Sequence, residues 1–529
     1  MVTLITAAFV IEAVQLTSLG IRGTGTVRND PVETLMRSVA RPDILDRTGR
    51  LMATDIAMPS LYVDPRRVID KDEVAEKLSG ALPGIDPRGL LADLSDKTRR
   101  FVWVKRTLTP LEAQKVHDLG LPGVAFRDEL RRVYPAGEDA GRVLGLVDAD
   151  NRGVSGIERY LDSQSLFDMT DGAARSERPA VALSLDLAVQ HSLRAELEQA
   201  ASDYGAGAAA GLVLDISTGE VLADVSLPDF PAGNAVLSLE PGRLDRITGG
   251  TFELGSVFKT ITLAMAEDAG VLLPGKTYDT AQALQVGAFS IDDFHPTRRQ
   301  LTAEEVFLHS SNIGASLMAR DVGEQRMRAF LDRLGLTGTL STELGRVAPP
   351  QLPQHWGALT TMTVSFGHGI ALAPLQFAAA AASLVRGDRV QPTFLKHQEA
   401  TLTQGTGPLV AAKTGDFLRL LMRHNVTNPE GTGKRAFVAG YDVGGKTGTA
   451  DIPGKGGYGR NGVLSSFLAV WPIRQPRYLS YILIWAPQPT EADKGQTAAG
   501  LTAAPVTARV ISRISPLLGL APVYSDGGM

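Results

Sequence analysis

A serine and a lysine three residues apart, Ser256 and Lys259, lie in the apolar stretch GSVFKT. Residues at positions i and i+3 of a helix are neighbours across one turn, so the amine can reach the hydroxyl. Burial beside Val257, Phe258 and Ile261 would disfavour the charged ammonium and lower the pKa of the lysine. A lysine that is neutral near pH 7 can accept the serine proton. The pair therefore predicts a serine nucleophile activated by a lysine, with a helix N-terminus favouring the negative charge that develops.

Ser310 and Asn312 form a second polar pair, in the stretch HSSNIGAS. An apolar run with a capping box at its start precedes them, and a helical pattern follows them. An S-x-N at the junction of two helices can point a hydroxyl and an amide into a cleft. An ordinary helix cap explains the same residues equally well when the stretch is considered alone.

The stretch VGGKTGTADI supplies a third set: Lys446, Thr447, Gly448 and Thr449. Its pattern suits a strand, in which Lys446 and Gly448 point one way and the two threonines the other. A glycine inside a strand often marks the close approach of a ligand backbone. We expect this strand to border a binding site.

Each motif has a simpler explanation or a similar sequence elsewhere in the chain. Ser and Lys three apart occur by chance in most chains, where the lysine is usually solvated. Gly440 to Thr447 also matches the phosphate-binding pattern G-x-x-x-x-G-K-[ST], which requires a helix after the lysine. Pro453 and several glycines follow instead, so we reject a nucleotide site. A second KTG begins a helical pattern, and its Thr414 is predicted to cap that helix.

Composition excludes several classes of function. The chain has 529 residues, a net charge of −5 and a pI of about 6, which argues against nucleic-acid binding. It contains no cysteine, so thiol nucleophiles, disulfides and cysteine-based zinc sites are excluded. Of the eight histidines only His309 adjoins a motif, so nothing places a histidine for a Ser-His-Asp triad. Asp292, Asp293 and His295 resemble metal ligands only loosely, and we predict no metal and no cofactor.

The elements that must position these motifs fall into two regions. The first region is charged and α+β, and it contains the predicted helices 70–82 and 109–120 and the predicted strands 60–65 and 100–106. The second region is predicted to form an antiparallel sheet with helices packed on its faces. Its predicted elements are a helix ending at Gly205, strands at 210–216, 221–226, 464–473 and 477–487, and a last helix from Pro505.

The first 20 residues, MVTLITAAFVIEAVQLTSLG, are the one long apolar stretch at a terminus. About 20 apolar residues span a bilayer as a helix, although Glu12 and Gln15 interrupt this stretch. A membrane helix and a buried amphipathic helix are both compatible with the pattern. A removable signal peptide fits poorly, since a basic start and a clear cleavage site are missing.

The order S-x-x-K, S-x-N, K-T-G resembles that of penicillin-binding proteins and their β-lactamase relatives. Four longer stretches extend the resemblance to class B, division-specific FtsI-type members. They are ARPDILDRTGRLMA at 40–53, with Pro42 where the family usually has glycine, GLVDADNRGVSGIERYLD at 145–162, SFGHGIALAPLQFA at 365–378, and AGYDVGGKTGTA at 439–450.

The resemblance implies an organisation and an activity. We expect a transmembrane anchor at 1–23, a non-catalytic α+β pedestal at 24–178 and a β-lactamase-like transpeptidase domain at 179–529. Such proteins are D,D-transpeptidases of the cytoplasmic (inner) membrane, single-pass, with the catalytic domain on the periplasmic side. They cross-link peptidoglycan stem peptides ending in D-Ala-D-Ala at the division septum, and β-lactams inhibit them.

The resemblance also implies residue roles on the acylation side of the site. Ser256 would attack the stem-peptide carbonyl, and Lys259 would be the general base. Ser310 would pass a proton to the leaving amine. Asn312 would hold Lys259 and the substrate amide. Lys446 would supply positive potential and help keep Lys259 neutral by repulsion.

On the binding side, Thr447 and Thr449 would hold the terminal carboxylate of the substrate, with Gly448 between them. The backbone N–H groups of Ser256 and Thr449 would form the oxyanion hole. A Glu-x-x-Leu-Asn block, with which class A β-lactamases activate a deacylating water, is not found between Ser310 and Lys446. We therefore expect slow hydrolysis of the acyl-enzyme.

Partners and alternative functions follow from the same comparison. The N-terminal region lacks the pattern of a glycosyltransferase, so a membrane glycan polymerase of the SEDS/FtsW type and other division proteins are expected partners. An elongation-type transpeptidase or a D,D-carboxypeptidase could use the same site. A β-lactam sensor should carry several membrane helices, and an inactive scaffold would be expected to lose Ser256, Lys259 or Lys446, all of which are present.

Overall fold

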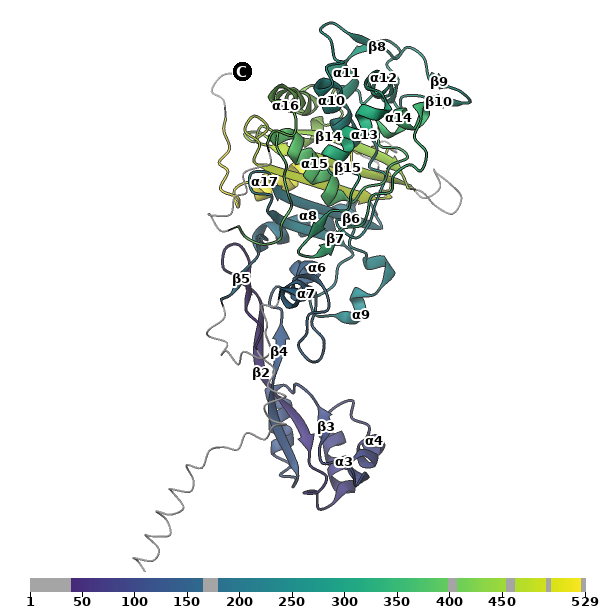
Figure 1. Cartoon of the computed structure of the whole chain (residues 1–529). Helices are drawn as coiled ribbons and strands as arrows, with labels where there is room; N and C mark the ends of the chain where they lie inside the picture. The colour runs from purple at the N-terminus through teal and green to yellow at the C-terminus, as the bar shows by residue number, and fades with distance from the viewer. Residues whose placement is uncertain (1–39, 165–178, 398–406, 453–461, 491–495, 525–529) are drawn as a thin grey trace, which may run out of the picture.

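Figure 1 shows a broad body of helices around a sheet, a narrow neck formed by β2 and β4, and a small end that carries β3, α3 and α4. This computed structural model describes residues 40–164, 179–397, 407–452, 462–490 and 496–524. The fold is α+β, as the sequence predicts. The expected anchor at 1–23 lies outside the described residues, and none of the helices within them is long and apolar enough to cross a membrane.

The small end and the neck share one sheet. Strand β2 (Leu51–Val63) pairs with β4 (Val124–Val133) over ten residue pairs, and β3 (Val102–Lys105) pairs with the end of β2. Helices α3 (Lys71–Ala81), α4 (Pro87–Ser95) and α5 (Pro110–His117) pack their apolar side chains against it. Both predicted helices and both predicted strands of this region are present.

Strand β2 is much longer than the predicted strand 60–65, and Pro59 explains the difference. A proline in the middle of a sequence usually argues against a strand because it lacks the N–H donor. Here the carbonyl of Pro59 accepts from the Leu108 N–H, on the side of β2 away from β4. The missing N–H would also face that side, so the strand continues through the proline without losing a bond to β4.

A buried charge cluster lies where the neck joins the broad body. The Glu158 carboxylate, fully buried, accepts from Arg41 Nε at 2.7 Å and from Arg132 Nε at 2.6 Å. Arg132 also pairs with Asp55 of β2, and Arg41 with Asp162. Arg41 and Glu158 are 117 residues apart. The stretches 40–53 and 145–162 are therefore joined directly by an ion pair.

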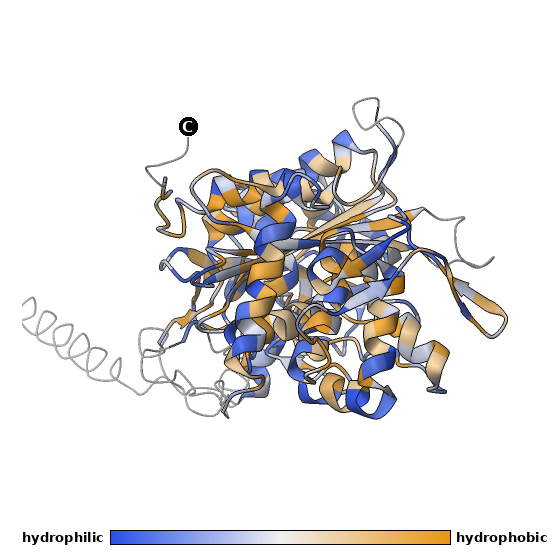
Figure 2. Cartoon of the chain, turned by 90° about the horizontal axis from the view of Figure 1, so that it is seen from above, coloured by the Kyte–Doolittle hydropathy of each residue, from blue (hydrophilic) through white to orange (hydrophobic). Residues whose placement is uncertain are grey.

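The broad body is built on a five-stranded antiparallel sheet in the order β14-β15-β16-β6-β7. Two helices cover one face with an apolar core, and the central helices α10, α15 and α16 lie on the other side. In Figure 2 orange and blue residues alternate within single helices, as expected of helices with one buried side. The strands are β6 (Ala208–Asp215), β7 (Val221–Leu227), β14 (Gly444–Asp451), β15 (Val463–Trp471) and β16 (Tyr478–Trp485), and the two covering helices are α8 (Leu187–Asp203) and α17 (Ala503–Ile514).

The remaining described elements complete the body and its loops. The helices are α6 (Gly141–Leu144), α7 (Gly156–Ser163), α9 (Ala235–Ser238), α10 (Lys259–Asp268), α11 (Ala303–Leu308), α12 (Asn312–Val322), α13 (Glu324–Arg333), α14 (Ala358–Val364), α15 (Pro374–Arg386) and α16 (Ala412–Thr427). The short strands are β1 (Ile44–Leu45), β5 (Val181–Ala182), β8 (Thr277–Asp279), β9 (Leu284–Val286), β10 (Phe289–Ile291), β11 (Gln300–Thr302), β12 (Ser341–Thr342) and β13 (Gly345–Arg346).

Two helix starts differ from the prediction. Thr414 does not cap α16: Ala411 takes the cap position, and Thr414 is buried in the first turn with its hydroxyl 3.5 Å from Asp268 Oδ1. The start was misplaced because a buried threonine and a capping threonine look alike in sequence. Helix α17 begins at Ala503, two residues before Pro505, and the proline fits inside the first turn, where no backbone N–H bond is required.

Candidate active site

Ser256 lies in a 3₁₀ turn, Gly255–Phe258, that leads directly into α10. Gly255 has a φ of +61°, and a Cβ there would be 2.5 Å from the carbonyl oxygen of Thr449. A residue with a side chain would push the turn away from β14. Glycine therefore lets the nucleophile turn lie directly against the strand that carries Thr449.

The amine of Lys259 lies among oxygen atoms from two motifs. Lys259 Nζ is 2.8 Å from Ser256 Oγ, 2.7 Å from the Ser310 carbonyl oxygen and 2.7 Å from Asn312 Oδ1. The side chain is fully buried, as its apolar sequence neighbours predicted. The predicted contact between the lysine amine and the serine hydroxyl is present.

The number of hydrogens on the amine fixes the direction of these bonds. A neutral amine has two N–H donors and one lone pair. The Ser310 carbonyl and Asn312 Oδ1 can only accept, so they take both donors. The lone pair is then left for a hydroxyl to donate to, and Ser256 Oγ at 2.8 Å is nearer than Ser310 Oγ at 3.2 Å. In this arrangement the lysine is already placed to remove the serine proton.

Burial lowers the pKa of Lys259 to about 7, because the dry surroundings disfavour the ammonium form, and the negative charge of Asp293 opposes this shift. A substantial fraction of the amine is therefore neutral near pH 7. The sequence predicts burial as the cause, with the charge of Lys446 adding to it by repulsion. Burial is the main cause for both lysines, and the repulsion lowers the pKa of Lys446, which lies well below its ordinary value.

The S-x-N stretch lies at the junction between α11 and α12, and its three residues make different contacts. The middle residue, Ser311, caps α12 by accepting from the Gly314 N–H and donates to Asp293 Oδ2. Asn312 Nδ2 donates to the backbone carbonyl of Asp292, which turns Oδ1 towards Lys259. The helix-cap explanation is thus correct for Ser311, while its two neighbours face the lysine.

Ser310 is held in an uncommon backbone conformation. Its φ is +57°, in the left-handed region that non-glycine residues rarely adopt. Its hydroxyl lies between the two amines, 3.2 Å from Lys259 Nζ and 2.9 Å from Lys446 Nζ. Such strain persists only where the surrounding contacts enforce it. The hydroxyl is thereby fixed as a bridge between the two lysines.

The KTG stretch is a strand, as predicted, and β14 continues past Thr447 where a phosphate-binding loop would require a helix. Lys446 Nζ is 3.2 Å from Thr447 Oγ1, so the two polar ends meet although the residues are adjacent along the strand. A Cβ on Gly448 would be 2.7 Å from the Leu254 carbonyl oxygen. Gly448 thus permits close approach of the chain's own nucleophile turn.

Three supporting residues were missed from sequence. Asp293 accepts from the Ile313 N–H and holds Ser311. Thr447 donates to Thr432, which donates to Asn425 Oδ1, and Asn425 Nδ2 donates to the Gly445 carbonyl. Helix α16 thus fixes the start of β14. No local pattern marks these residues, because each acts across at least seven and up to twenty positions of sequence.

The histidines and the loose acidic cluster have other contacts. Asp292 pairs with Arg298, and His368 lies 3.1 Å from Glu253, an arrangement that raises the pKa of His368. His309 is 3.7 Å from Glu430. Within the described ranges no histidine is bonded to Ser256, and no group of three or more His, Asp or Glu residues could hold a metal ion.

Comparison with known proteins gives the family. Residues 209–512 match the model of the penicillin binding protein transpeptidase domain, which covers more than half of the chain. The chain belongs to this family. Residues 37–165 match the model of the penicillin-binding protein dimerisation domain. Ser256, Lys259, Ser310 and Lys446 all lie within the transpeptidase match.

Individual relatives extend the match to nearly the whole chain. A protein of Caulobacter vibrioides named probable peptidoglycan D,D-transpeptidase FtsI is 37% identical over 91% of this chain and 82% of its own length. The peptidoglycan D,D-transpeptidase FtsI of Escherichia coli K12 is 27% identical over 92% of this chain and 85% of its own. The crystal structure of penicillin binding protein 2X from Streptococcus thermophilus superposes with a TM-score of 0.70 at 22% identity, covering 92% of this chain and 81% of that one, so it shares the fold.

Proposed function

We propose that this protein is a serine D,D-transpeptidase that cross-links peptidoglycan stem peptides during septal wall synthesis. The supporting observation is the buried Lys259 amine, which lies 2.8 Å from Ser256 Oγ and 2.7 Å from both the Ser310 carbonyl oxygen and Asn312 Oδ1. The names of the FtsI relatives support both the reaction and the division role.

In the proposed acylation, Lys259 takes the Ser256 proton as Oγ attacks the carbonyl of the penultimate D-alanine. The lysine becomes charged as the tetrahedral oxyanion forms, and the two charges stabilise each other in a dry site. Ser310 lies 3.2 Å from Lys259 Nζ and is placed to give its proton to the amine of the departing D-alanine while it takes the proton from Lys259, which becomes neutral again. The C–N bond breaks, and the peptide remains as an ester on Ser256.

The second half of the reaction reverses these roles. An amine of another stem peptide attacks the ester carbonyl while Lys259, again neutral, accepts its proton. Ser256 leaves and recovers a proton from the lysine. The new amide is the cross-link. Because the Glu-x-x-Leu-Asn block of class A β-lactamases is not found, water is activated poorly and a β-lactam remains bound as a long-lived acyl-enzyme.

Substrate binding is assigned to β14. Thr447 and Thr449 would hold the terminal carboxylate, with Lys446 supplying the positive potential. The N–H groups of Ser256 and Thr449 would form the oxyanion hole, and the close packing at Gly255 brings these two backbones together. Asn312 would bind a substrate amide in addition to holding Lys259.

The remaining proposals concern organisation. We place a membrane anchor at 1–23, the pedestal at 24–178 and the transpeptidase domain at 179–529, with the catalytic part on the periplasmic side of the inner membrane. A SEDS/FtsW-type glycan polymerase and other division proteins are the proposed partners. No cofactor enters the proposed reaction.

Fluorescent penicillin tests the reaction. We expect the purified chain to be labelled covalently, with the label mapped to the peptide that contains Ser256. Ser256→Ala abolishes labelling, whereas Ser163→Ala, a surface serine on α7, is labelled like the wild type. Labelling that persists in Ser256→Ala, or hydrolysis of the β-lactam many times per second, contradicts the proposal.

Depletion of the protein in cells tests the septal role. The depleted cells are expected to grow as filaments, and rounded cells would contradict this role.

A further inference from the structure

One edge of β4 has backbone groups that are not used by the sheet. Asp64 N–H donates to the Gly123 carbonyl, and Pro59, opposite Asp128, gives its carbonyl to Leu108 on the far side of β2. In an antiparallel pair, backbone bonds to the partner strand alternate along each strand. The N–H and C=O groups of Asp128 and of residues 126, 130 and 132 therefore point away from β2. In the described part of the chain no strand pairs with this edge.

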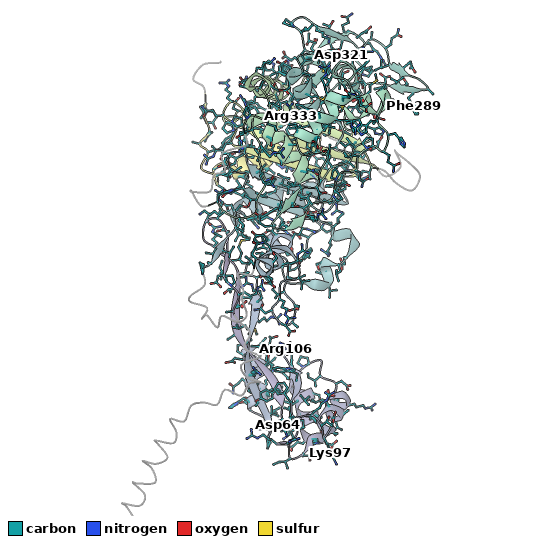
Figure 3. All side chains as sticks on the ribbon, viewed as in Figure 1. Asp64, Lys97, Arg106, Phe289, Asp321 and Arg333 are labelled. Atoms are coloured by element: carbon teal, nitrogen blue, oxygen red, sulfur yellow. The ribbon has the colours of Figure 1, made fainter. Side chains whose placement is uncertain are left out.

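A cavity of about 550 Å³ runs along the same edge. Residues 129–134 of β4 and its end form one side, and residues of the turn 147–151 together with Ala232 and Gly233 form the other. Arg106 and Thr107 lie towards the small end, and Figure 3 labels Arg106 at the neck. The groove thus has walls from the neck and from the broad body.

Three arginines and two carboxylates, Glu129 and Asp148, line the groove, and the arginines are not equally neutralised. Arg106 pairs with Glu129 and Asp150. Arg132 is held by Asp55 and Glu158, but its Nη2 is buried without a hydrogen-bond partner within the described ranges. Arg131 is exposed, donates to the Thr107 hydroxyl at 2.8 Å, and has no carboxylate partner among the residues that the structure describes. A carboxylate bound here would complement this charge.

We propose that this groove binds an extended, acidic segment of a partner protein, which adds to β4 as a further strand. The outward-facing groups of residues 126, 128, 130 and 132 supply the backbone bonds, and Arg131 receives an acidic side chain. Strand addition to a free edge is a recurring mode of peptide recognition, with side-chain contacts setting specificity. Because the groove has two walls, the bound segment touches both the neck and the broad body.

The charge of β4 argues for a different protein over a second copy of this chain. The strand VAFRDELRRV carries Arg127, Arg131 and Arg132 against Asp128 and Glu129, a net charge of +1. Two such edges would bring like net charges together, whereas an acidic strand would be attracted. The inference goes beyond the transpeptidase reaction and does not depend on it.

Binding of a fluorescein-labelled seven-residue peptide that alternates valine and glutamate, measured by fluorescence anisotropy, tests the proposal. We expect saturable binding to the full chain, and at least tenfold weaker binding of a peptide in which lysine replaces glutamate or of one with methylated backbone amides. Leu130→Pro removes an outward N–H without breaking a bond to β2 and is expected to weaken binding at least tenfold. Arg131→Glu is expected to do the same.

Two matched variants control these changes. Leu130→Ala keeps the backbone N–H, and Arg88→Glu reverses an exposed charge on α4, and both are expected to bind the peptide as the wild type does. Circular dichroism and thermal unfolding report that each variant is folded. Equal binding of the acidic and basic peptides, or unchanged binding by Leu130→Pro, overturns the proposal. A dimer in sedimentation that Leu130→Pro dissociates would also overturn it, by assigning the edge to a second copy.

Discussion

At the scale of single residues, the proposed mechanism depends on how few hydrogen bonds a neutral amine can donate. A neutral Lys259 would give its two donors to the Ser310 carbonyl and to Asn312 Oδ1, which would leave the lone pair for the hydroxyl of Ser256. An ammonium ion would have a third hydrogen and no lone pair. The same contacts would then hold Ser256 without activating it. In the proposed mechanism, the site is therefore catalytic when Lys259 is neutral, and it can only bind substrate when Lys259 is charged.

Replacing Asn312 with aspartate changes this state without changing the shape of the side chain. Asn312→Asp places a carboxylate 2.7 Å from Lys259 Nζ, which favours the ammonium and raises the pKa of Lys259 by about one unit or more. Acylation by penicillin at pH 7 is expected to fall about fivefold or more, because the neutral fraction of Lys259 drops from about a half to about a tenth, and to recover partly at higher pH. The measurement is the acylation rate as a function of pH.

Asn312→Leu is the matched variant. It removes the amide without adding a charge, so the rate is expected to fall at every pH while the pH at which the rate levels off does not rise. If Asn312→Asp lowers the rate equally at all pH values, the amide acts by shape alone and the electrostatic explanation is wrong.

The three motifs and the burial of Lys259 could be predicted from sequence, because the motifs and the apolar neighbours of Lys259 are each contained in a short stretch of the chain. It could not predict that Ser311 would cap α12 while Ser310 faces the lysines, because this depends on the φ of +57° at Ser310. Asp293 was considered only as a loose metal ligand. Its true role, holding the start of α12, requires a loop to fold back over 18 residues.

At the scale of elements, the site depends on β14 lying directly against the nucleophile turn. A Cβ on Gly448 would be 2.5 Å from Ser466 Oγ and 2.7 Å from the Leu254 carbonyl. Gly448→Ala is therefore expected to push β14 away from the turn. A displacement of about 1 Å can cost about a hundredfold in rate, so acylation should fall by about that factor while the fold is retained.

Gly207→Ala is the control, since no atom lies within 4 Å of a Cβ at Gly207 and its φ is not positive. It is expected to acylate at the wild-type rate. The acylation rates of both variants test whether the nucleophile turn is displaced, and their thermal unfolding tests whether the fold is retained. An unchanged rate in Gly448→Ala would show that the close packing at this strand does not position the nucleophile.

Element boundaries could be predicted where a capping residue marks them. Asp70, Asp86 and Thr109 each accept backbone N–H bonds at a helix start, and two of these three helices were predicted from sequence. The long strand β2 was predicted only in part, because the tolerance of Pro59 depends on which side of the strand faces β4. A register of this kind is fixed by tertiary pairing.

At the scale of the whole molecule, the buried cluster around Glu158 ties the neck to the broad body. Glu158→Gln keeps the volume but leaves Arg41 and Arg132 each without one anionic partner in a buried place. Breaking a buried ion pair in this way typically costs about 3–5 kcal/mol. We expect a lower urea midpoint for unfolding of the neck region, with penicillin labelling of folded protein retained.

Glu73→Gln provides the comparison, because Glu73 pairs with Lys77 on the surface of α3 with about half of each side chain exposed. Exposed pairs contribute little, so the urea midpoint should hardly move. Equal effects of Glu73→Gln and Glu158→Gln would mean that the cluster does not hold the two parts of the molecule together. The pairing itself could not be predicted from sequence, since its partners are 117 residues apart.

The most direct test of the central claim is the second-order rate of acylation by a β-lactam of fixed charge, measured from about pH 5 to about pH 9. If neutral Lys259 is the base, the rate rises about tenfold per pH unit at low pH and levels off above a pKa of about 7. The absence of cysteine allows Lys259→Cys to be alkylated with bromoethylamine to a thioether lysine of lower pKa, which should move the rise to lower pH. A rate that is level throughout, or that keeps rising past pH 9 as for an ordinary lysine, would contradict the account.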